Sequence, residues 1–177
     1  HPAGVPFTVT LTQGQVYNVM GTVSGNTGVD LTGSTIRSIN TGGGCKRIGV
    51  FSGSGRISIT CTGGSSSSDN YMVQAFPKSA WGKRYLTATS GGNQQNNIYR
   101  ICVSNPATVV TLNGAPIGLP LQGGFYYEIA ASNTPKLIEA DQPIMVAQYL
   151  TSRGACGNGN GNGDPEVIYL SPVEQNI

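Results

Sequence analysis

The feature that most constrains this chain is a series of short runs in which apolar and polar residues alternate, each closed by Gly, Ser, Asn or Pro. Residues 7–11 alternate in this way, a turn is expected at 12–15, and residues 16–19 return, which predicts a hairpin. Because alternate side chains of a strand point to opposite faces, such runs predict strands with one buried face. Similar runs follow at 48–51, 56–59, 71–73, 98–103, 108–112, 125–129, 144–149 and 167–170.

No long window of the sequence keeps a helical period. A helical turn could form within residues 132–140, but Pro135 and its β-branched neighbours favour an extended backbone at least as well. Asn113-Gly114 directly follows the run 108–112 and is the strongest hairpin signal of the chain. We therefore expect an all-β fold, an antiparallel β-sandwich of about ten to twelve short strands with little or no helix, with a closed barrel as the alternative.

The composition limits the kinds of partner. All-β units commonly reach 177 residues as one domain, so we expect a single domain over residues 1–177. Only 10% of the residues are charged and the formal net charge is +2, which does not fit a nucleic-acid binder. No run approaches the roughly 20 apolar residues of a membrane helix, so this segment is not expected to insert into a membrane. The Gly/Ser/Asn tracts 63–70 and 157–163 are predicted to be exposed loops.

The cysteines point to disulfides rather than to a metal. Cys45, Cys61, Cys102 and Cys156 lack Cys-x-x-Cys spacing, and His1 is the only histidine, so no zinc site is expected. Two disulfides are the better interpretation, and they imply an oxidising compartment. Three pairings are possible. We favour Cys45–Cys61, which flank a hairpin-like segment, and Cys102–Cys156 then follows by elimination.

A catalytic residue set is not predicted. A Ser-His-Asp or Cys-His arrangement cannot be built with one terminal histidine and paired cysteines. A glycosidase needs two carboxylates at a set separation. Glu139 and Asp141 would share a face of a strand, but a turn-forming or solvated role explains them more simply.

Two regions are candidates for ligand contact. Trp81, Lys83 and Tyr85 could stack on a sugar or anchor a protein partner, although burial of the only tryptophan between sheets is the simpler explanation. The Asn/Gly tract leads to Asp164 and Glu166, whose oxygens could accept Ca²⁺. That tract lacks the ligand spacing of a strong calcium loop, so we expect no cofactor, with Ca²⁺ as the alternative.

Several short polar motifs stand between the alternating runs. Their order resembles the N-terminal domain family of the IgG Fc-binding protein, a secreted mucus component whose relatives include large microbial surface proteins. The likeness covers residues 7–175 and is strongest from Trp81 onward. Asp30, at the head of the first motif, is also explained as an Asx turn. The motifs are Asp30-Leu31-Thr32-Gly33, Val50-Phe51-Ser52-Gly53, Trp81-Gly82, Tyr99-Arg100-Ile101, Glu139-Ala140-Asp141-Gln142-Pro143, Gly163-Asp164-Pro165 and Pro172-Val173-Glu174-Gln175.

The resemblance implies a secreted, non-catalytic domain for binding or adhesion, which forms a piece of a larger surface protein. Its partner would be a protein or glycan on a cell surface or in mucus, together with other domains of the parent protein. A fold-level likeness does not carry a ligand with it, so IgG Fc is one candidate among several. A structural spacer is the second hypothesis, and a carbohydrate-active enzyme, which would need two convergent carboxylates in a deep cleft, is the third.

Overall fold

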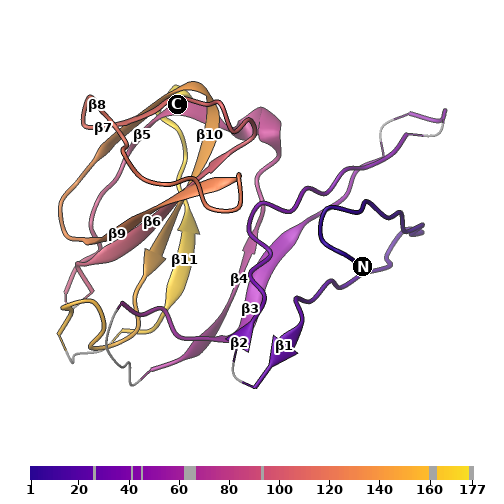
Figure 1. Ribbon diagram of the computed structural model, residues 1–177. Coiled ribbons are helices and arrows are strands. Elements are labelled where there is room, and N and C mark those ends of the chain that lie inside the picture. Colours follow the sequence, from indigo (N-terminus) through magenta and orange to yellow (C-terminus); the bar gives the residue numbers. More distant parts are fainter. Residues whose placement is uncertain are drawn as a thin grey trace. The chain divides into compact units, whose positions relative to one another are not determined.

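The computed structural model describes residues 1–25, 27–40, 42–44, 46–61, 67–92, 94–159 and 163–175. The chain forms two compact units, His1–Thr32 and Gly33–Ile177 (Figure 1). Strands make up 37% of the described residues and helices 4%, which confirms the prediction of an antiparallel all-β fold. The expectation of a single domain over residues 1–177 stays a prediction.

The N-terminal unit contains one short ladder. β1 (Val23–Ser24) pairs antiparallel with β2 (Thr27–Gly28). The predicted turn at 12–15 forms, since the Gln15 N–H donates to the Thr12 carbonyl at 3.1 Å, but residues 7–11 and 16–19 are not strands. The predicted hairpin ladder is therefore wrong. Two short strands without a covering layer are only marginally stable, and the apolar side chains of both segments are exposed.

The second unit is built on a seven-stranded sheet. All of its strand pairs are antiparallel. The turn between β7 and β8 is Asn113-Gly114, with φ of 51° and 81°, which confirms the hairpin signal. The strands are β5 (Gly82–Leu86), β6 (Asn97–Val103), β7 (Val110–Leu112), β8 (Ala115–Pro116), β9 (Tyr126–Ser132), β10 (Leu137–Leu150) and β11 (Glu166–Tyr169).

The long strand β10 turns a corner in its middle. Its first part pairs with β5 and β7, and its second part, from Ile144 to Leu150, pairs with β6 and β11, while Ile144 also pairs with Gly82 of β5. The register with β5 shifts between Glu139 and Ile144. Pro143 lies in this irregular stretch, where a residue without an N–H is tolerated. The Asp141 carboxylate holds the corner by accepting the Val109 N–H at 2.8 Å.

The corner lets the sheet curl around one apolar core. Tyr99 and Ile101 of β6 are fully buried, as period-two alternation requires, whereas Arg100 points to the opposite face. There the guanidinium lies 4.8 Å from the ring centre of Tyr126 and donates to Glu128 at 2.7 Å. The other members of the core are Tyr85, Val103, Val110, Ile129, Ile138, Ile144 and Val146.

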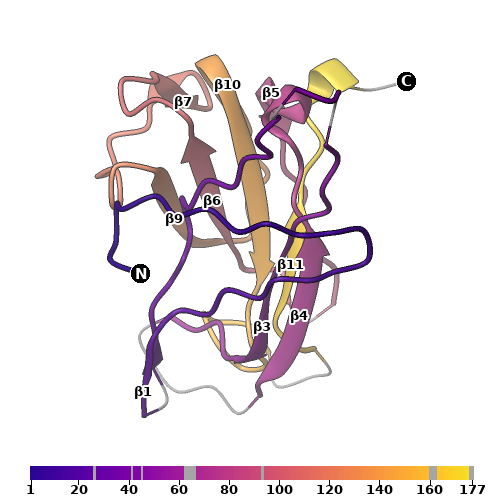
Figure 2. The same ribbon diagram turned by 90° about the vertical axis from the view of Figure 1, so that its right-hand side faces the viewer.

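A second, two-stranded sheet packs on the other face of the large one. It consists of β3 (Phe51–Ile57) and β4 (Asp69–Gln74), and β4 lies beside β11 in Figure 2. A smaller apolar cluster around Ile59, Ala147 and Val167 lies between the two sheets. Two sheets that share an apolar layer fit the predicted sandwich.

One prediction about this small sheet is wrong. Residues 48–51 and 56–59 were expected to be two strands, but β3 is continuous across the glycines between them. A side chain at Gly53 would place its Cβ 2.4 Å from the Tyr71 carbonyl oxygen of β4. This glycine therefore permits close approach of two strands rather than a turn.

Candidate functional site

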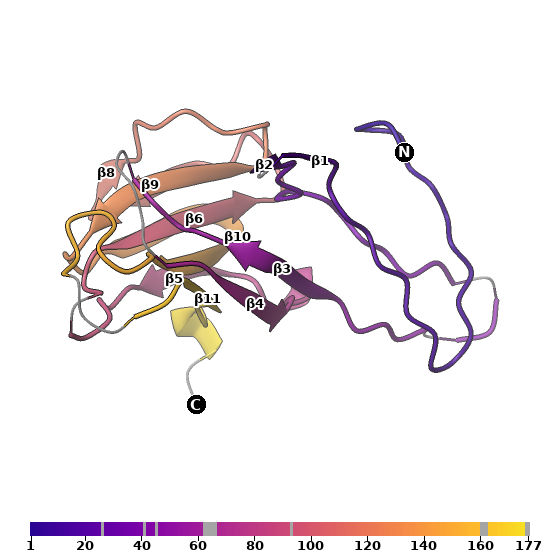
Figure 3. The same cartoon turned by 90° about the horizontal axis from the view of Figure 1, so that it is seen from below.

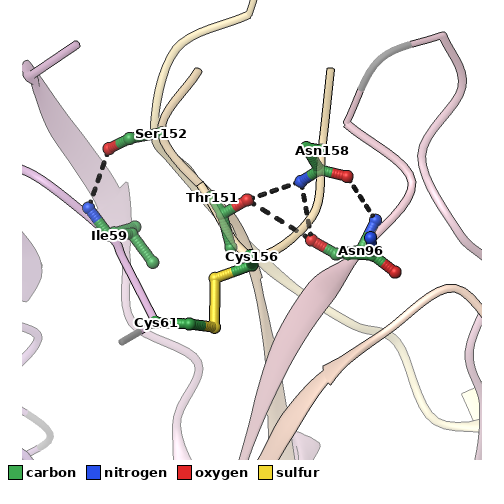
Figure 4. Close-up of a disulfide and its surroundings, with 7 residues drawn as sticks. All are labelled: Ile59, Cys61, Asn96, Thr151, Ser152, Cys156 and Asn158. Carbon is green, nitrogen blue, oxygen red and sulfur yellow. Dashed lines mark hydrogen bonds between the residues drawn. A yellow bond between two sulfur atoms is a disulfide. The ribbon is translucent and has the colours of Figure 1, made fainter. Parts of the chain in front are cut away.

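One disulfide ties the small sheet to the loop that follows β10. Cys61 is bonded to Cys156, with 5.1 Å between the Cα atoms (Figure 4). Both predicted pairings, Cys45–Cys61 and Cys102–Cys156, are therefore wrong. Cys102 is buried in β6, and Cys45 lies outside the described residues. Proximity in sequence favoured the short loop, whereas packing of the small sheet brings Cys61 to a residue 95 positions away.

Next to the disulfide, three residues form what we call the amide clasp: Asn96, Thr151 and Asn158. The Asn158 side chain accepts the Asn96 N–H at 2.8 Å and donates to the Asn96 carbonyl at 3.1 Å. It also donates to the Thr151 hydroxyl at 2.6 Å (Figure 4). The Asn158 side chain thus satisfies the backbone N–H and carbonyl of Asn96, as a neighbouring strand would, and joins the segment before β6 to the Asn/Gly loop.

A second set of side-chain amides, those of Gln94, Asn97 and Gln148, forms hydrogen bonds next to the amide clasp. Asn97 is fully buried, and its amide donates to the Gln94 carbonyl at 2.9 Å and accepts from Gln148 at 2.6 Å. The Gln94 side chain donates to the carbonyls of Thr151 and Asp164, at 2.9 and 3.0 Å. Buried amides that are fully hydrogen-bonded make a local structure rigid, so the loops start from fixed positions.

These loops surround a polar depression of about 240 Å³. Its walls come from the segment before β6, the turn between β9 and β10, and the Asn/Gly loop after β10. The sequence predicted the Asn/Gly tract as a contact region but missed the other two walls, although the run Gln94-Gln95-Asn96-Asn97 at the start of a strand was a signal for one of them. The depression is lined by Gly92, Gln95, Asn96, Asn133, Gly157, Asn158 and Gly159.

The structure changes the interpretation of the Trp81 region. Tyr85 is only 1% exposed, and its hydroxyl donates to the Ile144 carbonyl at 2.7 Å, so the predicted ligand contact at Tyr85 is wrong. Trp81 is half-buried, and its indole N–H has no hydrogen-bond partner among the described residues. Lys78 lies over the indole ring at 5.9 Å, and Lys83 is exposed. A ligand contact at Lys83 stays a prediction.

Two of the short motifs interlock beside Trp81. A Cβ on Gly82 would lie 2.2 Å from the Pro172 ring, so only glycine allows this approach. The Glu174 carboxylate of the short 3₁₀ helix η2 (Val173–Gln175) accepts the Lys83 N–H at 2.9 Å. Gln175 donates to the Ala80 carbonyl, at the end of the short helix η1 (Lys78–Ala80), at 2.7 Å. The two motifs therefore hold the chain end against β5.

This contact changes the pKa of the Glu174 carboxyl. Desolvation raises its pKa, but backbone N–H groups of Glu174, Lys83 and Arg84 and the charge of Arg84 together outweigh it. The pKa of Glu174 is consequently lower than its ordinary value of 4.5.

Asp164 and Glu166 are both exposed, beside the Asn/Gly loop. The Asp164 carbonyl is already bonded to Gln94, and the Glu166 carboxylate accepts the Val167 N–H at 2.9 Å. Within the described ranges, no three His, Cys, Asp or Glu residues come together as a metal-binding group. Ligand contact at both residues, and the alternative of Ca²⁺, stay predictions.

The two carboxylates considered for catalysis have structural partners. Glu139 pairs with Arg84 at 2.9 Å, and Asp141 caps the Val109 N–H. Each is accounted for by the corner of β10 and the strands beside it, in agreement with a structural role.

Polar loops carried by an all-β scaffold are a common arrangement in binding domains. A family model described as IgGFc binding protein matches residues 1–177, and the chain belongs to this family. Membership confirms the family resemblance and indicates an extracellular binding domain. No curated protein and no solved structure gives a significant match. Among the described residues, no helix has the length and apolar character to cross a membrane.

The disulfide gives a first prediction. Replacing both Cys61 and Cys156 by Ser should lower the free energy of unfolding by about 4 to 5 kcal/mol, because the bridge closes a very long loop. Urea denaturation measures this loss. A non-reduced digest should contain one peptide pair that joins Cys61 to Cys156, in the wild type and in a Cys102→Ala control. A peptide pair that joins Cys45 to Cys61 would contradict the structure.

The Glu174 contact gives a second prediction. Because its pKa is lower in the folded than in the unfolded state, the carboxylate stabilises the fold above pH 4.5, and this stabilisation is lost as the pH falls through the lower folded-state value. Glu174→Gln should therefore cost less than about 1 kcal/mol near neutral pH, since the group is solvent-screened. Urea midpoints of wild type and variant should converge in acid. A difference that persists in acid would show that the contact does not depend on the charge.

Proposed function

We propose that this domain is an extracellular, non-catalytic binding module for a protein or glycan on a cell surface or in mucus. The ligand contacts the loops around the polar depression. Family membership supports a binding role, and the Cys61–Cys156 disulfide is typical of an oxidising compartment. Rigid scaffolds with functional loops are the common arrangement of binding domains.

The observation that carries this proposal is the amide clasp beneath the depression. Asn158 is tied to Asn96 and Thr151 before any ligand arrives, through three hydrogen bonds of 2.6 to 3.1 Å. A ligand then does not have to order these loops, which lowers the entropy cost of binding. Gln95 and Asn133 are exposed at the depression and can present amide donors and acceptors to it.

The candidate ligands follow from the family and from the lining. The family description names IgG Fc, which is one candidate protein. The residues that line the depression are uncharged amides and glycines, which suit the hydroxyl and amide groups of a glycan or a peptide backbone. Mucins offer both kinds of group.

A structural spacer is the second candidate. None of the described residues that line the depression is aromatic, and polar loops without an exposed aromatic anchor suit a spacer. A carbohydrate-active enzyme has less support, because the described lining of the depression contains no carboxylate and Glu139 is paired with Arg84.

Binding of the purified domain to IgG Fc, to mucins and to a glycan array tests the proposal. Gln95→Ala combined with Asn133→Ala should weaken saturable binding roughly tenfold, because two ligand hydrogen bonds of about 0.5 to 1.5 kcal/mol each are lost. Gln142→Ala removes an exposed amide at the corner of β10 and is the matched control.

Trp81→Ala is a poor probe, because the half-buried indole lies beside the interlocked motifs and its loss would disturb packing. Thermal melts of all variants verify folding. If no target binds, the spacer hypothesis replaces the binding module. If a target binds equally to all variants, the ligand contacts another surface.

A further inference from the structure

A different part of the second unit carries a concentration of positive charge. Two segments, 34–40 and 46–50, run side by side ahead of β3, and we call them the arm (Figures 1 and 3). The Ser38 hydroxyl donates to the Lys46 carbonyl at 2.5 Å and joins the two segments. The arm lies within the compact unit Gly33–Ile177.

The arm holds cations and no acids. Arg37, Lys46 and Arg47 are all exposed, and none of them forms an ion pair with a described residue. Between Asp30 and Asp69 the sequence has four Lys or Arg residues and no Asp or Glu. The rest of the chain has six cations and eight acids, so the net positive charge of this protein comes from residues 31–68. Three of the four cations of this stretch belong to the arm, and the fourth is Arg56.

The contact between the two segments keeps these cations close to one another along the chain. Ser38, the neighbour of Arg37 in sequence, donates to the carbonyl of Lys46, the neighbour of Arg47. Like charges that lie close together repel, and no described acid side chain is paired with them. An anionic ligand bound to this part of the arm would turn the repulsion into attraction. Guanidinium groups bind sulfate and carboxylate oxygens in a bidentate manner.

We propose that the arm binds an anionic polysaccharide through its sulfate or carboxylate groups. The disulfide and the family indicate an extracellular domain, where anionic polymers are mainly glycans. Single-stranded nucleic acids need aromatic side chains for base stacking, and residues 34–50 contain none. The proposal goes beyond the binding function of the depression, because it uses different residues and a different ligand chemistry.

Immobilised heparin is the probe, with neutral dextran as the reference polymer. Wild-type protein should bind heparin and should not bind dextran. Its affinity for heparin should fall steeply as salt is added. Arg37→Gln with Arg47→Gln should weaken heparin binding roughly tenfold, since each exposed charge pair contributes up to about a factor of five. Arg37→Lys with Arg47→Lys keeps both charges and should retain most of the affinity.

Lys78→Gln with Lys83→Gln is the matched control. It removes the same number of charges from another surface, so it should leave heparin binding close to that of the wild type. Equal losses in both double variants would mean that net charge rather than the arm binds the polymer, and this would overturn the proposal. Absence of heparin binding would overturn it too, as would equally tight, arm-dependent binding to phosphatidylserine vesicles, which would make the arm a membrane-contact element. Gln95→Ala with Asn133→Ala should not affect heparin binding, so this test is independent of the depression.

Discussion

Strand β10 is the element on which the rest of the second unit depends. Its fourteen residues pair with four other strands, and the corner held by Asp141 divides these pairings into two halves. The bend lets one sheet enclose the Tyr99 and Ile101 side chains without a second large sheet. It also leads the chain end of β10 to Thr151, Ser152 and the disulfide, where the Ser152 side chain accepts the Ile59 N–H at 2.9 Å. The end of β10, the disulfide and the segment after β3 thereby meet at one set of loops.

Several of the short motifs have a structural role in this scaffold. Gly82 and Pro172 are in contact because glycine has no side chain that would keep them apart. The Glu174 carboxylate accepts a backbone N–H of β5. The motif from Glu139 to Pro143 is the corner of β10. Gly163 lies against the Gln94 side chain, which also binds the Asp164 carbonyl. These motifs therefore support the fold, whereas the residues that line the depression and most of the arm lie outside the motifs.

Much of the fold could be predicted from local patterns. Alternation identified most strands, and Asp30 forms the expected Asx turn, accepting the Thr32 N–H at 2.9 Å. Strand β5 was missed, because Lys83-Arg84 interrupts the pattern while Tyr85 alone faces the core. The disulfide and the amide clasp were missed for a common reason. They join residues 95 and 62 positions apart, and such contacts depend on how the sheets pack, which periodicity does not encode.

The central claim is that two walls of the depression, around Asn96 and Asn158, are joined before a ligand binds. Native-state hydrogen exchange followed by NMR tests it most directly, because it reports on the backbone N–H groups that the side-chain amides hold. The account predicts strong protection of the Asn96 and Ser90 amides, which donate to Asn158 and Asn97, although neither residue lies in a strand. The Gly92 amide, in the same loop, should exchange quickly. Fast exchange at Asn96 and Ser90 would contradict a preformed site and leave the depression without its physical basis.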